Sequence, residues 1–144
     1  LNDEDIHHFE CLRIPSTNEQ RDFDDLVLGL TKVLIDSLNE KQLNKFIEKE
    51  LRGGIKGGIS RLEAVFKNNC IEEYEDHIQF LRKLQNLRSS SSAHRKGSNY
   101  IKIATEFEIG SKDLISVFGG ILAKSVDLLD YFIGVCSSAE LQKS

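Results

Sequence analysis

Residues 71–97 read IEEYEDHIQFLRKLQNLRSSSSAHRKG, and this stretch decides the fold class. Its apolar side chains recur every three or four positions, a spacing that predicts a long amphipathic helix. These side chains are Ile71, Tyr74, Ile78, Leu81, Leu84 and Leu87. Acidic residues stand in the first turn and basic residues in the last, which suits the helix dipole. The serines at 89–92 are expected to end the helix or to act as a hinge.

The same helical spacing recurs on both sides of this stretch. Three further amphipathic helices are predicted, around residues 23–38, 43–51 and 59–66. The last helix, from about Lys112 to Val135 with Ser111 as its cap, is apolar on most faces and is expected to be the buried central helix. Residues 1–18 are polar and contain the only proline, so they are interpreted as an irregular leader or linker before a helical domain over 19–144. Ser16, Thr17 and Asn18 offer caps for the first helix of that domain.

One segment has a different period. Ile101, Ile103, Phe107 and Ile109 alternate with polar neighbours, which is typical of extended chain. Since no second strand is evident, the segment is expected to be an extended connector or a short hairpin arm. The sequence therefore predicts an all-α fold, a four- to five-helix bundle with an extended connector before the last helix.

Composition narrows the class of protein. Of 144 residues, 40% are hydrophobic and 29% charged, as in an ordinary globular domain. No apolar run is long enough to span a bilayer, and no secretory leader is evident, so no membrane association is expected. Three widely spaced cysteines favour reduced thiols in a cytoplasmic protein. The chain starts at Leu1 and has no methionine, which suggests a piece of a longer polypeptide with other domains.

Charge is distributed unevenly. The net charge is -4, yet residues 77–105 contain no Asp or Glu. Six basic residues fall in this interval: Arg82, Lys83, Arg88, Arg95, Lys96 and Lys102. An acidic chain does not suit a protein coated in positive charge for duplex binding. A local basic surface for a nucleic-acid strand remains compatible with it.

Arg88 and His94 are the candidate catalytic residues. A guanidinium grips phosphate and stabilises charge that builds in a transition state. An imidazole moves protons near neutral pH, and RNA carries its own nucleophile in the 2′-hydroxyl. In an unbroken helix the two residues point about 120° apart, so a break in the serine run is needed to bring them together. This chemistry uses no metal and no cofactor, and none is expected.

Arg88 and His94, separated by five residues, resemble the R-x(4-6)-H motif of HEPN domains. Residues 81–88 and 93–97 extend this resemblance to HEPN domains at the ends of large bacterial defence proteins. The resemblance implies an all-α bundle, a metal-independent ribonuclease of toxin–antitoxin or abortive-infection type, and a homodimer with a composite cleft. Arg82, Lys83, Arg95, Lys96 and Lys102 would then bind the RNA backbone.

Two positions depart from the family pattern. Ser89 stands where many catalytic members have a polar residue such as asparagine, and Lys96 stands where members silenced by AMP transfer have tyrosine. Control by a nucleotidyltransferase antitoxin is therefore in doubt. The alternatives are a non-catalytic HEPN-like module that binds RNA, a nucleotide or a partner protein, and a plain dimerisation bundle. Glu63 is interpreted as a solvated face residue, with the orientation of a site arginine as its other possible role.

Overall fold

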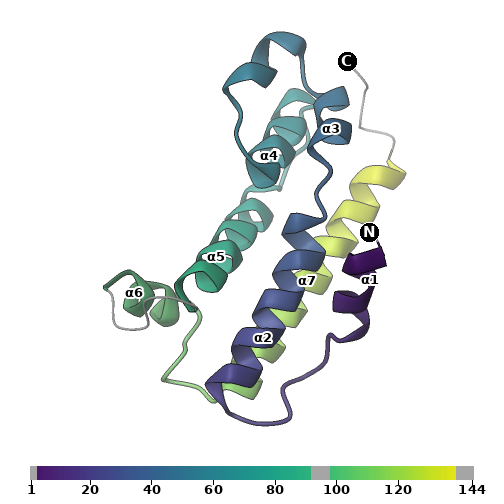
Figure 1. The fold of residues 1–144 in the computed structure, drawn as a ribbon. Helices are drawn as coiled ribbons and strands as arrows, with labels where there is room; N and C mark the ends of the chain where they lie inside the picture. Colours follow the sequence, from purple (N-terminus) through teal and green to yellow (C-terminus); the bar gives the residue numbers. More distant parts are fainter. Residues whose placement is uncertain (1–2, 92–97, 139–144) are drawn as a thin grey trace.

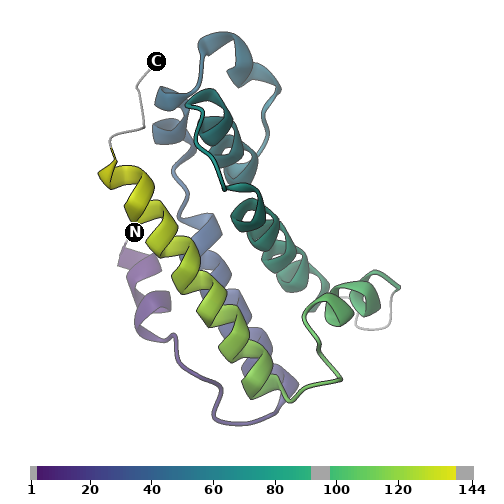
Figure 2. The same ribbon diagram turned by 180° about the vertical axis from the view of Figure 1, so that it is seen from behind.

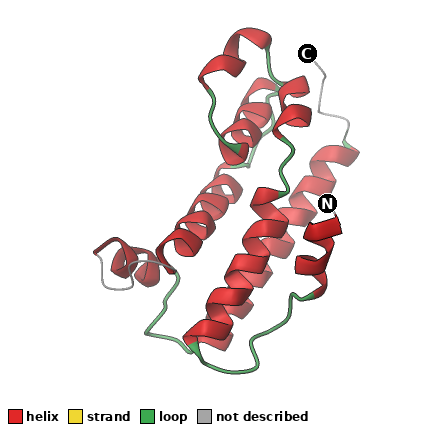
Figure 3. Ribbon diagram, viewed as in Figure 1, coloured by secondary structure: helices red, strands yellow, loops and turns green. Residues whose placement is uncertain are grey.

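The computed structural model describes residues 3–91 and 98–138 and has an all-α fold in these ranges, as predicted. Helices α2 (Gln20–Thr31) and α7 (Leu114–Ser137) lie side by side along most of their length (Figure 1). Phe23 of α2 and Phe118 of α7 are almost fully buried, with ring centroids 6.1 Å apart in an edge-to-face arrangement. Figure 3 shows only helices and loops in the described part of the chain.

The helix predicted from residues 71–87 is α5 (Glu75–Ser91), which packs against α2. The side chains that the spacing selects in this helix are buried: Ile78, Leu81, Leu84 and Leu87. Phe80 is buried as well, although the spacing did not select it. The helix includes Ser89 and Ser90 without a break and its described part ends at Ser91, so these serines do not interrupt it. Ser92, the last serine of the run, lies outside the described residues. The helix predicted around 59–66 is α4 (Gly58–Asn68), with Ile59, Leu62, Val65 and Phe66 buried.

The helix predicted over 43–51 is wrong in its length. The structure has three short pieces instead: α3 (Glu40–Leu43), η2 (Asn44–Phe46) and η3 (Lys49–Gly54). Ile47, between η2 and η3, is fully buried, while Leu51 is 54% exposed. The paired glycines at 53–54 and 57–58 oppose a continuous helix here, because glycine loses more backbone entropy in a helix than any other residue. The helix predicted over 23–38 is observed as α2 and the π-helical segment η1 (Lys32–Asp36) that continues it.

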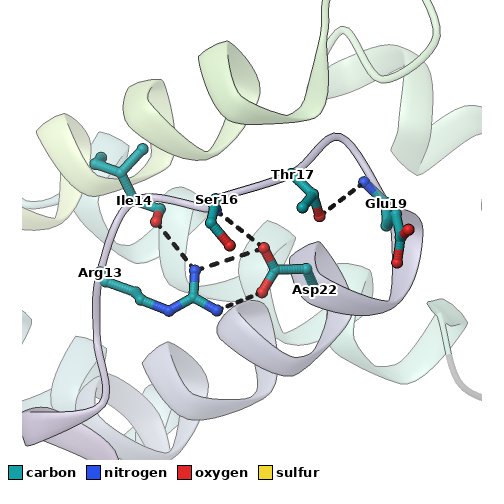
Figure 4. Close-up of polar contacts among 6 residues, drawn as sticks. All are labelled: Arg13, Ile14, Ser16, Thr17, Glu19 and Asp22. Carbon is teal, nitrogen blue, oxygen red and sulfur yellow. Dashed lines mark hydrogen bonds and ion pairs between the residues drawn. The ribbon is translucent and has the colours of Figure 1, made fainter.

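The prediction of an irregular leader over residues 1–18 is also wrong for part of its length. Residues Asp3–Glu10 form a helix, α1, that packs on α2 and η1, and His8 Nε2 lies 2.9 Å from Lys32 Nζ. Arg13 ties the following segment to the first turn of α2 through Asp22, with Nη2 2.6 Å from Oδ1 (Figure 4). The Ser16 backbone N–H donates to the same carboxylate at 3.1 Å. The hydrogen bond from Arg13 holds the pKa of Asp22 below its usual value.

The prediction that residues 101–109 form extended chain is wrong for the first part of this segment. Ser98–Glu106 is helical (α6) and packs on α5, so the connector is confined to residues 107–113, where Ile109 and Lys112 form an isolated bridge. Buried Ile103 and Ala104 mark the inner face of α6, whereas Ile101 is 62% exposed. The isoleucines at 101 and 103 suggested a period of two, which is typical of extended chain. Only Ile103 belongs to the core, so that period does not describe the buried face of the helix.

Helix α7 has the predicted bounds within two residues but not the predicted burial. One face packs into the core, through Val117, Phe118, Ile121 and Leu128 among others. Other apolar side chains of the helix are open to solvent: Val126, Leu129 and Ile133 are 55%, 45% and 63% exposed. Figure 2 shows α7 in front of α2, with no other described element over its outer side. The helix is therefore an outer wall of the bundle, and the prediction of a central helix is wrong.

The caps also differ from those predicted. The N-cap of α7 is Asp113, whose carboxylate accepts a hydrogen bond from the Ser116 backbone N–H at 3.0 Å, and not Ser111. Asn18 accepts from the Ile115 backbone N–H at 3.2 Å, so it caps α7 across space and leaves α2 without a side-chain cap. None of the described helices is long and apolar enough to cross a membrane.

Candidate functional site

The last turn of α5 carries Arg88, the first of the two candidate catalytic residues. Leu87 beside it is 1% exposed and fixes the helix against the core, while the Arg88 side chain is 32% exposed. The position therefore combines a rigid backbone with a guanidinium that solvent and ligands can reach. A cation in the last turn is also favoured by the negative end of the helix dipole.

Asp36 holds the Arg88 guanidinium. Arg88 Nη1 donates to Asp36 Oδ2 at 2.7 Å, and the Asp36 side chain is 42% exposed. Asp36 ends the π-helical segment η1 that continues α2. A π-helical turn holds more residues than an α-helical one, so it alters the direction of the side chains that follow it, and such turns recur at functional sites. The sequence did not reveal Asp36 as the partner of Arg88. The two residues are 52 positions apart, and no spacing pattern links residues at that distance.

The second candidate catalytic residue, His94, lies outside the described residues, as do Arg95 and Lys96. The described chain ends on one side of this segment at Ser91 and resumes at Ser98. Three residues, Ser89 to Ser91, thus separate Arg88 from the segment that carries His94. The geometry of the Arg88–His94 pair itself stays a prediction.

Two more cations of α5 point elsewhere. Arg82 Nη2 contacts Glu63 Oε2 of α4 at 2.5 Å, and Glu63 Oε1 also accepts from Lys67 at 2.8 Å. The hydrogen bond from Lys67, with that from Arg82, holds the pKa of Glu63 below its ordinary value. Lys83 Nζ lies 3.7 Å from Glu106 Oε2 of α6. Glu63 does orient an arginine, but that arginine is Arg82.

These contacts divide the predicted basic surface. Arg82, Lys83 and Arg88 are each paired with a carboxylate on a different element: α4, α6 and η1. Successive helical residues are rotated by 100°, so the three side chains leave α5 in three directions. Lys102 is exposed on α6. The structure thus does not bring Arg82 or Lys83 beside Arg88, and Arg88 is the candidate best placed to meet a ligand at this end of α5.

A separate open cleft of about 380 Å³ lies between α5, the α6–α7 connector and α7. It contains His77, whose ring stacks on Tyr131 with centroids 4.4 Å apart. Tyr131 in turn donates through its hydroxyl to the Glu72 carbonyl at 2.7 Å. The ring of His77 is thus part of the packing between α5 and α7. Within the described ranges, no group of three His, Cys, Asp or Glu side chains is arranged to hold a metal ion.

Comparisons with protein-family models, with curated proteins and with solved structures found no match for this chain.

Proposed function

We propose that this chain is a HEPN-type, metal-independent endoribonuclease domain in which Arg88 and His94 act on the scissile phosphate. The observation that carries the proposal is the placement of Arg88. It stands at the end of a rigid helix, partly exposed, immediately before the segment with His94, and its guanidinium is already oriented by a carboxylate.

The pair with Asp36 leaves Arg88 able to bind phosphate. Ion pairs as exposed as this one contribute about 0–1 kcal/mol, because water solvates both partners. A bidentate contact between guanidinium and phosphate is among the stronger charge-assisted interactions. An RNA phosphate can therefore displace Asp36 from the Arg88 guanidinium, or bind the guanidinium beside it, at a small cost in free energy. Asp36 would then keep the guanidinium extended in the free protein.

In the proposed reaction the ribose 2′-oxygen attacks the neighbouring phosphorus and the 5′-oxygen leaves. His94 transfers a proton, either from the 2′-hydroxyl or to the leaving 5′-oxygen, and Arg88 stabilises the added negative charge on the phosphate. The products are a 2′,3′-cyclic phosphate and a 5′-hydroxyl. By the HEPN resemblance, Arg88 and His94 of two chains would face each other in one cleft, in an effector of toxin or antiviral-defence type.

The test is incubation of the protein with labelled single-stranded RNA in excess EDTA. We expect cleavage with a 2′,3′-cyclic phosphate product, and no cleavage when the residue 5′ to the scissile phosphate is a 2′-deoxynucleotide. Arg88→Ala and His94→Ala should each abolish cleavage and retain the helical circular dichroism spectrum.

Arg82→Ala is the matched control, since it removes the same charge from the same helix at a site that faces α4. It should retain most of the activity. Full activity in either Arg88→Ala or His94→Ala would refute the mechanism. RNA binding without cleavage in the unaltered chain would instead identify a non-catalytic binding module.

A further inference from the structure

The open cleft between α5 and α7 is basic at one end. The two helices run in opposite directions (Figure 2), and the stacked rings of His77 and Tyr131 join them at one level. From this stack Lys83 is six residues further along α5, and Lys124 is seven residues back along α7. Because an α-helix rises about 1.5 Å per residue, both lysines lie about 9–11 Å from the stack, in the same direction along the cleft. They line the cleft from opposite walls.

The end of the cleft nearer the stack is acidic. Asp76 precedes His77 on α5 and therefore stands at the level of the stack. Asp127 is four residues from Tyr131 on α7, which places it about 6 Å from the stack and between the two ends. Both carboxylates line the cleft. The charges thus follow a fixed order along its length, with Asp76 first, Asp127 second and the two lysines last.

Three of these charged side chains have no partner in the part of the chain that the structure describes. The side chains of Asp76, Asp127 and Lys124 make no hydrogen bond and no ion pair there. Lys83 differs, since its Nζ lies 3.7 Å from Glu106 Oε2. The unpaired charges of the cleft are therefore two negative and one positive, and a ligand can reach all three.

Aromatic rings line the cleft as well. Phe80, which is 7% exposed, and half-buried Phe107 both contribute to its lining. An aliphatic chain can lie along these rings while its charged ends reach the polar walls. With a volume of about 380 Å³, the cleft is in the size range of small-molecule sites.

We propose that the cleft binds a free basic amino acid, with L-arginine as the best fit. The charges of extended arginine follow the order carboxylate, α-ammonium and guanidinium, which is complementary to Lys124, Asp127 and Asp76 in turn. Its carboxylate and guanidinium carbons are six bonds apart, about 7–8 Å in an extended chain, so the molecule spans most of the distance from the lysines to Asp76. A guanidinium pairs with a carboxylate bidentately and is less strongly hydrated than an ammonium, which favours arginine over lysine.

Titration with L-arginine at constant ionic strength, followed by ¹H–¹⁵N NMR, tests the site. We expect saturable shifts of the backbone amides in residues 76–83 and 124–131, with a Kd on the order of 1 mM because the cleft is open. Citrulline lacks the guanidinium charge and agmatine lacks the carboxylate, so each should bind about fivefold more weakly than arginine. Shifts that do not saturate, or equal affinity for the three molecules, would overturn the proposal.

Two substitutions assign the ends of the ligand. Asp76→Asn should weaken arginine binding about fivefold and leave citrulline binding unchanged, since citrulline has no charge at that end. Lys124→Gln should weaken arginine binding and leave agmatine binding unchanged, because agmatine has no carboxylate to lose a partner.

Glu75→Gln is the matched control, because it removes a charge from the same turn of α5 at an exposed position outside the cleft. It should bind arginine as the unaltered chain does. An equal loss in Asp76→Asn and Glu75→Gln would mean that only the net charge of the chain attracts the ligand, and it would overturn the site. Circular dichroism checks that each variant retains its helices. The site uses neither Arg88 nor His94, so these outcomes are independent of the proposed nuclease activity.

Discussion

At the scale of single residues, the contact between Arg88 and Asp36 is the one that most affects the proposed chemistry. It joins the last turn of α5 to a π-helical turn, and both side chains remain partly exposed. The carboxylate orients the guanidinium, but it also carries a negative charge that opposes an approaching phosphate. These two effects can be separated, because asparagine retains an oxygen acceptor without the charge.

Asp36→Asn should therefore tighten RNA binding. Two unit charges a few ångströms apart in water interact by about 1 kcal/mol, so removing the repulsion should lower the Kd about fivefold. Filter binding at fixed low salt measures the change. Glu63→Gln is the control, since it removes a carboxylate that pairs with a different arginine of the same helix. An equal gain in both variants would mean that only the net charge matters and that Asp36 has no special position.

The ion pairs of Glu63 make a pH-dependent contribution to stability. Its pKa is lowered in the folded chain, first by the hydrogen bond from Lys67 and then by that from Arg82. A lowered pKa stabilises the fold above the ordinary pKa of the group, and this contribution disappears as the pH falls through the lowered value. Glu63→Gln should lower the free energy of unfolding by up to about 1 kcal/mol at neutral pH.

The difference between Glu63→Gln and the unaltered chain should shrink to nothing in acid, below the lowered pKa. Urea unfolding of both proteins across this range measures it. A difference that persists unchanged in acid would assign the effect of the substitution to packing instead of charge.

At the scale of elements, the start of α7 depends on a cap contributed by its own connector. Asp113 accepts hydrogen bonds from the hydroxyl and the backbone N–H of Ser116, at 2.7 and 3.0 Å. These bonds lower the pKa of Asp113, so the ionised cap stabilises the helix at neutral pH and is lost as the pH falls through that lowered value.

Asp113→Ala should accordingly lower the Tm at neutral pH, whereas Asp113→Asn should retain most of it, because asparagine is also a good N-cap. Thermal unfolding followed by circular dichroism compares the two variants. The deficit of the alanine variant should diminish in acid. If alanine and asparagine gave the same Tm, the cap would contribute nothing and Asn18 alone would satisfy the first turn.

The elements that could be predicted are those whose burial follows one period. Leu81, Leu84 and Leu87 fall on a single face, and the structure buries all three. Helix α6 was missed because exposed Ile101 stands two positions before buried Ile103, and a period of two appeared where the core uses Ile103 and Ala104. The outer face of α7 was misjudged for the opposite reason. Apolar residues that face away from the core look, in the sequence, the same as residues that face it.

The candidate site was predictable only in its local part. Arg88 could be selected because its helix and its neighbours are contiguous in sequence. The partners of the cations could not, since Asp36, Glu63 and Glu106 lie on other elements, and helix packing decides which of them each cation meets. A single basic surface that includes Arg82, Lys83 and Arg88 was predicted from their proximity in sequence, but helical rotation sends the three side chains in different directions.

At the scale of the whole molecule, α2 and α7 share one core, and Phe118 is its central contact. Phe118 is fully buried against Phe23, so two helices far apart in the sequence stabilise each other through this pair. Helix α5 packs on the same α2. The bundle should therefore unfold as one cooperative unit, although its helices were predicted one at a time.

Phe118→Ala tests this cooperativity. Replacing a fully buried phenylalanine by alanine typically costs about 3–5 kcal/mol, which is a large part of the 5–15 kcal/mol that stabilises an ordinary domain. Urea unfolding should show this loss with helical circular dichroism and tyrosine fluorescence changing together. Ile101→Ala, at an exposed position, should change the free energy of unfolding by no more than about 0.5 kcal/mol. If Phe118→Ala separated the two transitions, α7 would be unfolding from a core that persists without it, and α2 with α5 would form the stable unit of the fold.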